Sequence, residues 1–264
     1  MPSPRESALV ARLRAAGCVY AEEEAVLLTE AADSAAALER LVRQRADDGL
    51  PLEQVLGWAA FGGLRVPLSP GVFVPRRRTE LLAREAVACS RAGSTVVELC
   101  CGSGAISLVL LAAFPHLDLT AAELEPAAVA CAADNLRGRA PVLAGDLYDP
   151  LPARLRGRVD VLVANAPYVP RGAIALMPAE ARDHEPTVAL DGGDDGLDVL
   201  RRVINGAPDW LAPSGALLLE CSERQLDAAE SAVRLAGLQP EVRRDDELEA
   251  TVVVGFSRGA GPER

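Results

Sequence analysis

Residues 94–114, STVVELCCGSGAISLVLLAAF, decide the fold. The opening STVVELC is typical of a buried strand, and the closing GAISLVLLAAF predicts a helix. Between them Gly102 and Gly104 lie where the strand turns into the helix. Glycines let a backbone approach a ligand closely, and a helix N-terminus offers free N–H groups. A tight structural turn explains a G-x-G pattern equally well, so this loop alone identifies no ligand.

Strand-like and helix-like segments alternate from this stretch to the C-terminus. Further strands are predicted at residues 117–123, 140–146, 158–165 and 215–221, and further helices at residues 125–138, 196–211 and 223–237. Residues 240–246 and 249–257 can close the sheet as a hairpin. This alternation predicts an α/β fold with a mostly parallel sheet and helices on both faces.

The chain before this region has a different character. Residues 4–56 place apolar residues at helical spacing in three short segments, and Asp33 or Ser34 can cap one of them. Residues 57–75 are rich in Gly and Pro and predict a hairpin with a linker. We therefore expect a helical domain at 1–56, a β-hairpin and linker at 57–78, and a catalytic domain at 79–264.

Three carboxylic acids follow successive strands. Glu123 ends its strand 21 residues after Gly102, the spacing at which a carboxylate can accept hydrogen bonds from ribose hydroxyls. A dinucleotide site would have a third glycine where Ser107 stands, so a nucleoside without a pyrophosphate suits the loop better. S-adenosylmethionine is the common one. Glu98 would then lie near its ammonium group and Asp146 near its adenine amino group.

The stretch RVDVLVANAPYVPRG, residues 158–172, ends an apolar run in Asn165, Ala166, Pro167 and Tyr168. Asn and Pro form turns, but a turn does not require the tyrosine. An amide or exocyclic amine nitrogen is a poor nucleophile because its lone pair is delocalised. The Asn165 side-chain carbonyl and the Ala166 backbone carbonyl can hold both N–H bonds and aim the lone pair at a sulfonium methyl group. This chemistry needs no metal and no strong base.

Charge and composition exclude several classes of protein. The formal net charge of −11 lowers the odds of a nucleic-acid partner. The six cysteines form no C-x-x-C pair and there are only two histidines, so no metal site is expected. No run approaches the roughly 18 apolar residues of a membrane span, and the N-terminus lacks a signal-peptide pattern. We expect a cytoplasmic protein with free thiols.

Several ordered motifs carry a family resemblance over roughly residues 50–256. They are VLGWAAFGGLRVPLSPGVFVPRRRTELL, VELCCGSGAI, AAELEPAAVACAADN, GDLYDPL, NAPYVP and EPTVALDGGDDGLDVLRRV. Together they resemble the protein-(glutamine-N5) methyltransferases, the HemK or PrmC family. The resemblance implies a class I S-adenosylmethionine-dependent methyltransferase, with a Rossmann-like seven-stranded sheet and a small N-terminal helical domain. Its substrate would be a glutamine side-chain amide, as in the Gly-Gly-Gln loop of peptide-chain release factors or in a ribosomal protein.

The resemblance also assigns roles by position. The catalytic residues would be Asn165, Ala166, Pro167 and Tyr168. The substrate would touch Asn165, Ala166, Tyr168, Glu185 and Pro186. The cofactor site would comprise Phe73, Pro75, Arg76, Glu98, Cys100, Gly102, Gly104, Glu123, Asp146 and Asn165. The N-terminal helices would help to dock the protein substrate.

The chain departs from the family pattern around the pocket. Ala166 replaces the first proline of the Asn-Pro-Pro-Tyr tetrad, and Cys100 replaces a glycine. Arg77 and Arg78 replace a proline and an acidic residue, and His184 stands where an aromatic residue is usual. These changes indicate a divergent member whose protein substrate need not be a release factor.

Two alternative functions stay open on the sequence. Enzymes that methylate the amino group of adenine in DNA or RNA use related Asn/Asp-Pro-Pro-Tyr tetrads, although the acidic chain lacks an evident phosphate-binding surface. The other alternative is a paralogue that binds the cofactor but has lost activity, which the changes at Cys100 and Ala166 would allow.

Overall fold

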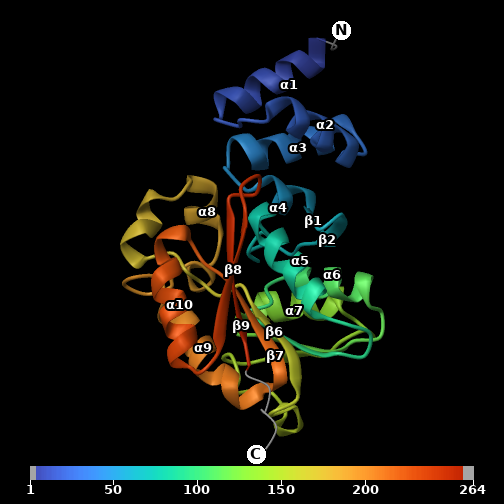
Figure 1. Cartoon of the computed structure of the whole chain (residues 1–264). Helices are drawn as coiled ribbons and strands as arrows, with labels where there is room; N and C mark the ends of the chain where they lie inside the picture. The colour runs from blue at the N-terminus through green and yellow to red at the C-terminus, as the bar shows by residue number, and fades with distance from the viewer. Residues whose placement is uncertain (1–3, 258–264) are drawn as a thin grey trace, which may run out of the picture.

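The computed structural model describes residues 4–257, so residues 1–3 and 258–264, the outer ends of two expected domains, lie outside the described residues. Four helices begin the chain: α1 (Pro4–Ala15), α2 (Ala21–Ala31), α3 (Ala35–Ala46) and α4 (Leu52–Leu56). They share a core of their own around Leu13, Leu28 and Val42, and α1, α2 and α3 lie above the rest of the molecule in Figure 1. Ser34 is the cap of α3, because its side chain accepts a hydrogen bond from the Ala37 N–H.

A two-stranded antiparallel hairpin follows, formed by β1 (Trp58–Phe61) and β2 (Leu64–Pro67). Gly62 and Gly63 both have positive φ, as the two-residue turn between the strands requires. Phe61 and Val66 pack into the same core cluster as residues of the large sheet. The hairpin is therefore held against the second part of the molecule, and its linker leads to η1 (Arg77–Thr79) and α5 (Glu80–Cys89).

Seven strands form the large sheet in the order β5-β4-β3-β6-β7-β9-β8. They are β3 (Thr95–Leu99), β4 (Asp118–Glu123), β5 (Val142–Ala144), β6 (Val159–Ala164), β7 (Leu211–Glu220), β8 (Gln239–Asp245) and β9 (Ala250–Phe256). The first five in this order are parallel, whereas β9 pairs antiparallel with both β7 and β8. The predicted seven-stranded, mostly parallel sheet is confirmed, including its closing hairpin.

Helices cover both faces of this sheet. The remaining long helices are α6 (Ala105–Ala113), α7 (Pro126–Asn135), α9 (Asp198–Trp210) and α10 (Leu226–Leu235). Apolar residues of α5, α6 and α7 belong to one core cluster, and those of α9 and α10 belong to another. The sheet is thus buried on both sides, which explains why its strands are nearly continuous apolar runs.

A segment without a clear sequence pattern connects β6 to α9. It contains η3 (Arg171–Leu176), α8 (Ala179–His184) and η4 (Thr187–Ala189). Glu180 of α8 forms an ion pair with Arg45 of α3, with 2.8 Å between Oε2 and Nη1. This contact joins the connecting segment to the N-terminal helices. Among residues 4–257, no helix combines the length and the apolar character needed to cross a membrane.

Candidate active site

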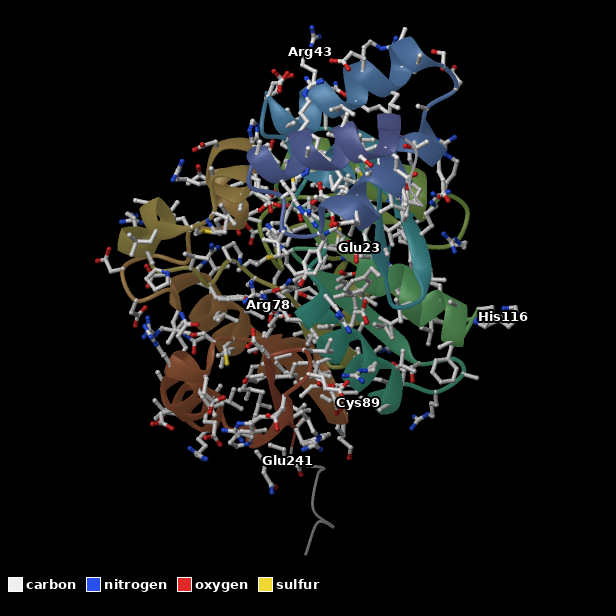
Figure 2. The ribbon with its side chains drawn as sticks, turned by 90° about the horizontal axis from the view of Figure 1, so that it is seen from above. Glu23, Arg43, Arg78, Cys89, His116 and Glu241 are labelled. Atoms are coloured by element: carbon white, nitrogen blue, oxygen red, sulfur yellow. The ribbon has the colours of Figure 1, made fainter. Side chains whose placement is uncertain are left out.

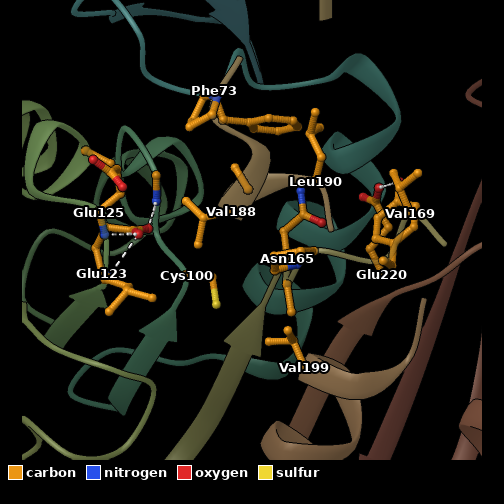
Figure 3. Close-up of a pocket in the computed structure, with 18 of the residues that line it drawn as sticks. Phe73, Cys100, Glu123, Glu125, Asn165, Val169, Val188, Leu190, Val199 and Glu220 are labelled. Carbon is orange, nitrogen blue, oxygen red and sulfur yellow. Dashed lines mark hydrogen bonds between the residues drawn. The ribbon is translucent and has the colours of Figure 1, made fainter. Parts of the chain in front are cut away.

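A cavity of about 360 Å³ lies at the carboxyl ends of the parallel strands. Strand order reverses between β3 and β6, and ligands of such sheets bind at that point. The volume falls in the range of roughly 300–1,000 Å³ typical of small-molecule sites. Figure 3 shows residues of distant chain segments converging here, among them Cys100, Glu123, Asn165 and Glu220.

The loop after β3 and the end of β4 form one wall. The Glu123 carboxylate accepts hydrogen bonds from the backbone N–H groups of Gly102, Leu124 and Glu125, at 2.8, 2.8 and 2.9 Å. The dashed lines around Glu123 in Figure 3 mark these contacts. Glu123 therefore both lines the cavity and fixes the glycine loop beside it. Asp146, after β5, also lines the cavity and pairs with Arg202 at 2.7 Å.

The glycine loop contains three residues in the left-handed conformation. Gly102 and Gly104 have φ values of 55° and 76°, and Cys100 has a φ of 54°. Cys100 is one of the few residues with a side chain that adopts this conformation, and it lines the cavity together with Gly102. Gly104 does not line it. A Cβ on Gly104 would approach the Leu136 side chain to 3.2 Å, so this glycine serves the packing of α6 against α7.

Glu98 does not lie where the sequence analysis expected it. Its side chain is buried outside the cavity lining, and its Oε2 accepts hydrogen bonds from the N–H and the hydroxyl of Ser107 in α6. Burial raises the pKa of Glu98 to about 8, against the opposing effect of the Ser107 hydrogen bonds. Side chains of a strand point alternately to the two faces of the sheet, and Glu98 points to the face that α6 covers. Its carboxylate therefore does not reach the cavity at the end of the strand.

Asn165, Ala166, Pro167 and Tyr168 all line the cavity, immediately after β6. The Asn165 side chain donates from Nδ2 to the Thr79 hydroxyl at 3.2 Å. Within residues 4–257, no hydrogen bond is made to Asn165 Oδ1 or to the Ala166 carbonyl. Both oxygens are thus available as acceptors for a ligand.

Glu220, the last residue of β7, is a cavity residue that the sequence analysis missed. Its Oε1 accepts a hydrogen bond from the Tyr168 hydroxyl at 2.7 Å, whereas Oε2 has no partner among the described residues. The signal was available in the sequence, because a carboxylate ends the apolar run GALLLEC. Neighbouring parallel strands end at the same edge of a sheet, and Ala164 of β6 pairs with Leu219 of β7.

The connecting segment and the linker close the cavity from the other side. Pro186 lines it, and so do Val188 and Leu190, which Figure 3 labels. Phe73 and Arg76 of the linker also line it, with the Arg76 guanidinium 5.0 Å from the Phe73 ring centroid.

Pro75 and Glu185 lie outside the cavity lining, which differs from the expectation. Glu185 accepts hydrogen bonds from the Val74 N–H at 3.2 Å and from Arg76 Nη2 at 2.5 Å. Glu185 is turned away from the cavity because its carboxylate is taken up by these linker groups. No cluster of three or more potential metal ligands occurs in the part of the chain that the structure describes.

Known proteins resemble this chain over most of its length. Residues 64–181 match the family described as Methyltransferase small domain. The release factor glutamine methyltransferase of Bordetella pertussis is 39% identical over 203 residues, which are 75% of this chain and 74% of that protein. The chain belongs to the release factor glutamine methyltransferase family. This confirms the family resemblance that the motifs carried.

Two further comparisons bear on fold and substrate. A solved methyltransferase from Pyrococcus furiosus matches with a TM-score of 0.56 at 16% identity, covering 74% of this chain and 90% of that one, and supports the fold alone. The 4-amino-L-phenylalanine/4-methylamino-L-phenylalanine methyltransferase of Streptomyces pristinaespiralis is 39% identical over 71% of this chain and 66% of that protein. The matched region spans about two thirds of the length of several of the curated relatives.

S-adenosylmethionine is the methyl donor that membership of this family implies, as predicted, and the cavity fits it. A nucleoside needs an acceptor for its ribose hydroxyls and apolar walls for its base. Glu123 supplies a carboxylate on the cavity wall, and Leu124, Leu147 and Val199 supply apolar surface near Asp146.

Proposed function

We propose that this chain transfers a methyl group to the side-chain amide nitrogen of a glutamine in a protein substrate, and that a release factor is the first substrate to test. The observation that carries the proposal is the pair of acceptors at the end of β6. Asn165 Oδ1 and the Ala166 carbonyl both belong to cavity residues, and neither accepts a hydrogen bond from residues 4–257. A primary amide has two N–H bonds, which matches two acceptors.

These residues would activate the substrate by orientation. When bound, S-adenosylmethionine would supply the methyl group by cleavage of its S–CH₃ bond, and the amide nitrogen would release one proton to solvent as the N–CH₃ bond forms. The two oxygens hold the amide NH₂ and stabilise the positive charge that develops on nitrogen, because dipoles fixed before the reaction need no reorganisation during it. Tyr168, held by Glu220, shapes the pocket wall beside the amide. Alignment of the nitrogen with the methyl carbon supplies the proximity effect.

The cofactor roles belong to the same proposal. Glu123 would accept from the ribose hydroxyls and Asp146 from the adenine amino group, with Cys100 and Gly102 beside them on the cavity wall. Phe73 and Arg76 would contact the cofactor from the linker. Glu98, Gly104 and Glu185 would act indirectly, through Ser107, Leu136 and Arg76, and Pro75 would act only as part of the linker.

Substrate docking is also proposed from the arrangement of the chain. The separate core of the N-terminal helices supports residues 1–56 as a unit of its own, joined through residues 57–78 to a catalytic domain at 79–264. The pair between Arg45 and Glu180 connects this unit to the segment that covers the cavity. A protein substrate bound to the helices would therefore lie beside the cavity entrance.

The test is an assay of the purified full chain with labelled S-adenosylmethionine and a recombinant release factor, followed by mass spectrometry. We expect one methyl group on the glutamine of the Gly-Gly-Gln loop. The Asn165→Ala variant should lose about 100-fold or more in turnover, the scale for one preorganised hydrogen-bonding group, while its affinity for the cofactor stays within about twofold.

Equal turnover in Asn165→Ala would contradict the assignment of the pocket. Incubating a cell lysate with the labelled cofactor extends the test to other substrates. Label on a glutamine of another protein would name that protein, whereas label on nucleic acid would contradict the proposal. Cofactor binding without turnover on any substrate would identify a paralogue that has lost activity.

A second candidate substrate is the amino group of a free aromatic amino acid. The Arg78 side chain lines the cavity and makes no ion pair or hydrogen bond among residues 4–257, so it could bind a carboxylate. Figure 2 shows Arg78 near the middle of the molecule, whereas Arg43 and His116 lie at its edges. The Streptomyces relative named for 4-amino-L-phenylalanine is a precedent for such chemistry. Assaying 4-amino-L-phenylalanine beside the release factor, with wild type and Arg78→Met, separates the two candidates.

A further inference from the structure

We propose that Thr79, backed by Glu220, determines which end of the Asn165 side-chain amide faces the cavity. Thr79 would then be a positioning residue for methyl transfer. The inference rests on the proposed function, since it concerns the same amide-binding pair of oxygens. Nothing in the sequence pattern pointed to Thr79, which lies 86 residues before Asn165 in the chain.

The contact between Thr79 and Asn165 lies behind the cavity wall. Asn165 Nδ2 donates to Thr79 Oγ1 at 3.2 Å. Thr79 is 3% exposed and does not line the cavity, so its hydroxyl does not reach a bound substrate. It ends η1 at the start of α5, where the helix fixes its backbone. Thr79 can therefore act on the reaction only through Asn165.

The two ends of an asparagine amide have nearly the same shape, so shape alone does not orient the group. A hydroxyl can orient it only when its own hydrogen is directed elsewhere. Glu220 provides that direction, because a carboxylate only accepts hydrogen bonds. Burial raises the pKa of Glu220, while the hydrogen bond from the Tyr168 hydroxyl, the nearby Thr79 hydroxyl and the charge of Arg78 favour its charged form. This carboxylate would attract the Thr79 hydrogen, which leaves the lone pairs of the Thr79 hydroxyl to accept from Asn165 Nδ2.

This arrangement leaves Asn165 Oδ1 for the substrate. If the Asn165 side-chain amide were reversed, its Nδ2 would face the substrate NH₂. Both groups are hydrogen-bond donors, so no hydrogen bond would form between them. Glu220 accepts a hydrogen bond from the Tyr168 hydroxyl at 2.7 Å, so this buried carboxylate holds a second member of the tetrad directly. Figure 3 shows Glu220 beside Asn165 at the edge of the cavity. The end of η1 and the end of β7 therefore both support the amide-binding site, through Thr79 on Asn165 and through Glu220 on Tyr168.

The first test compares Thr79→Val with Thr79→Ser. Valine keeps the shape of threonine and removes the hydroxyl, whereas serine keeps the hydroxyl and removes a methyl group. We expect Thr79→Ser to keep at least about half of the wild-type kcat and Thr79→Val to lose about tenfold or more, with KM for the cofactor within about twofold in both. A packing role predicts the opposite order, because valine fills the space better than serine.

Thr120→Val is the matched control. Thr120 is 1% exposed in β4 and its hydroxyl has no hydrogen-bond partner in the described part of the chain. Its replacement removes a buried hydroxyl without touching Asn165, and it should keep kcat within about twofold of wild type. Equal kcat values in Thr79→Val and Thr79→Ser would overturn the inference.

The second test reads the orientation directly and needs no turnover. The chain has only three asparagines, Asn135, Asn165 and Asn205, so labelling asparagine with ¹⁵N gives three side-chain NH₂ signals in an NMR spectrum. The signal lost in Asn165→Asp identifies Asn165. We expect its hydrogens to exchange with solvent about tenfold or more faster in Thr79→Val than in wild type or Thr79→Ser, because the hydrogen bond that protects them is lost.

Asn135 is the internal reference, since its Nδ2 donates to the Pro67 and Ser103 carbonyls at 2.9 Å and none of the substitutions touches these contacts. An unchanged Asn165 signal in Thr79→Val would overturn the inference. If the wild type methylates no glutamine, the proposed function fails, and the NMR comparison still decides whether Thr79 orients Asn165.

Discussion

Arg76 and Glu185 form an ion pair beside the cavity, with 2.5 Å between Nη2 and Oε2. The Glu185 side chain is completely buried, whereas that of Arg76 is 27% exposed. Burial raises the pKa of Glu185, and Arg76 and the Val74 N–H oppose this by stabilising the carboxylate. The pair connects the segment between β6 and α9, which covers the cavity, to the linker. The two residues that hold this segment in place are 109 positions apart in the chain.

Replacing Arg76 should weaken the attachment of the segment between β6 and α9 to the linker. We expect Arg76→Met to destabilise the protein by about 1–3 kcal/mol, because Glu185 stays buried without its charged partner. The value is below that of a fully buried pair, since Arg76 is partly exposed to water. Urea unfolding measures the stability, and limited proteolysis should cut residues 170–190 faster. Arg182→Met is the control, because Arg182 pairs with the adjacent Asp183 on the surface. Identical unfolding midpoints for the two variants would refute this role of the pair.

Glu123 should matter for cofactor binding. We expect Glu123→Ala to weaken the affinity for S-adenosylmethionine by about 1–3 kcal/mol, or roughly 5- to 150-fold, the scale for a lost hydrogen bond to a charged group. The variant also frees the Gly102 N–H that Glu123 now binds. Isothermal titration calorimetry measures the affinity, with Glu30→Ala on the exposed face of α2 as the control. An affinity equal to that of the control would remove Glu123 from the site.

Glu98 should make stability depend on pH. Its pKa is raised in the folded state from 4.5 to about 8. The folded protein therefore holds this proton more tightly than the unfolded chain, so the contribution is complete below about pH 4.5 and is lost as pH rises toward 8.

The comparison that isolates this effect uses Glu98→Gln, which is neutral at every pH. Between pH 5 and 8, the free energy of unfolding of the wild type should fall relative to that of Glu98→Gln by on the order of a few kcal/mol. Urea unfolding of both proteins at several pH values measures the difference. Parallel curves would show that Glu98 titrates normally.

Cys100 should store backbone strain at the start of the glycine loop. Its φ of 54° is costly for any residue with a Cβ, by about 1–2 kcal/mol. The Cys100→Gly and Cys100→Ala variants both lack the sulfur atom. Only the alanine variant keeps a Cβ at this position and therefore keeps the backbone strain. We expect the glycine variant to be the more stable of the two by about 1 kcal/mol in urea unfolding.

Cys131 provides the opposite case, because it lies inside α7. There the glycine variant should be less stable than the alanine variant by about 1 kcal/mol. Finding the same sign at both positions would exclude backbone strain at Cys100.

The sequence by itself determined the sheet and the edge at which the site forms. Apolar runs alternating with helical periodicity allow few arrangements other than a parallel sheet covered on both faces. Because all parallel strands end at one edge, residues that follow different strands meet whatever the details of packing. Glu123, Asp146 and Asn165 line one cavity for this reason.

Only the tertiary structure decided the contacts behind that edge. Thr79 meets Asn165 and Arg76 meets Glu185 across long stretches of chain, and no local periodicity encodes such pairs. The segment from β6 to α9 has no regular pattern, so its place over the cavity follows from packing and from the pair between Arg45 and Glu180. The direction of Glu98 depended on the strand's rotation, which placed it against Ser107. Local sequence fixes where a strand ends, whereas the packing of distant segments fixes what each terminal side chain faces.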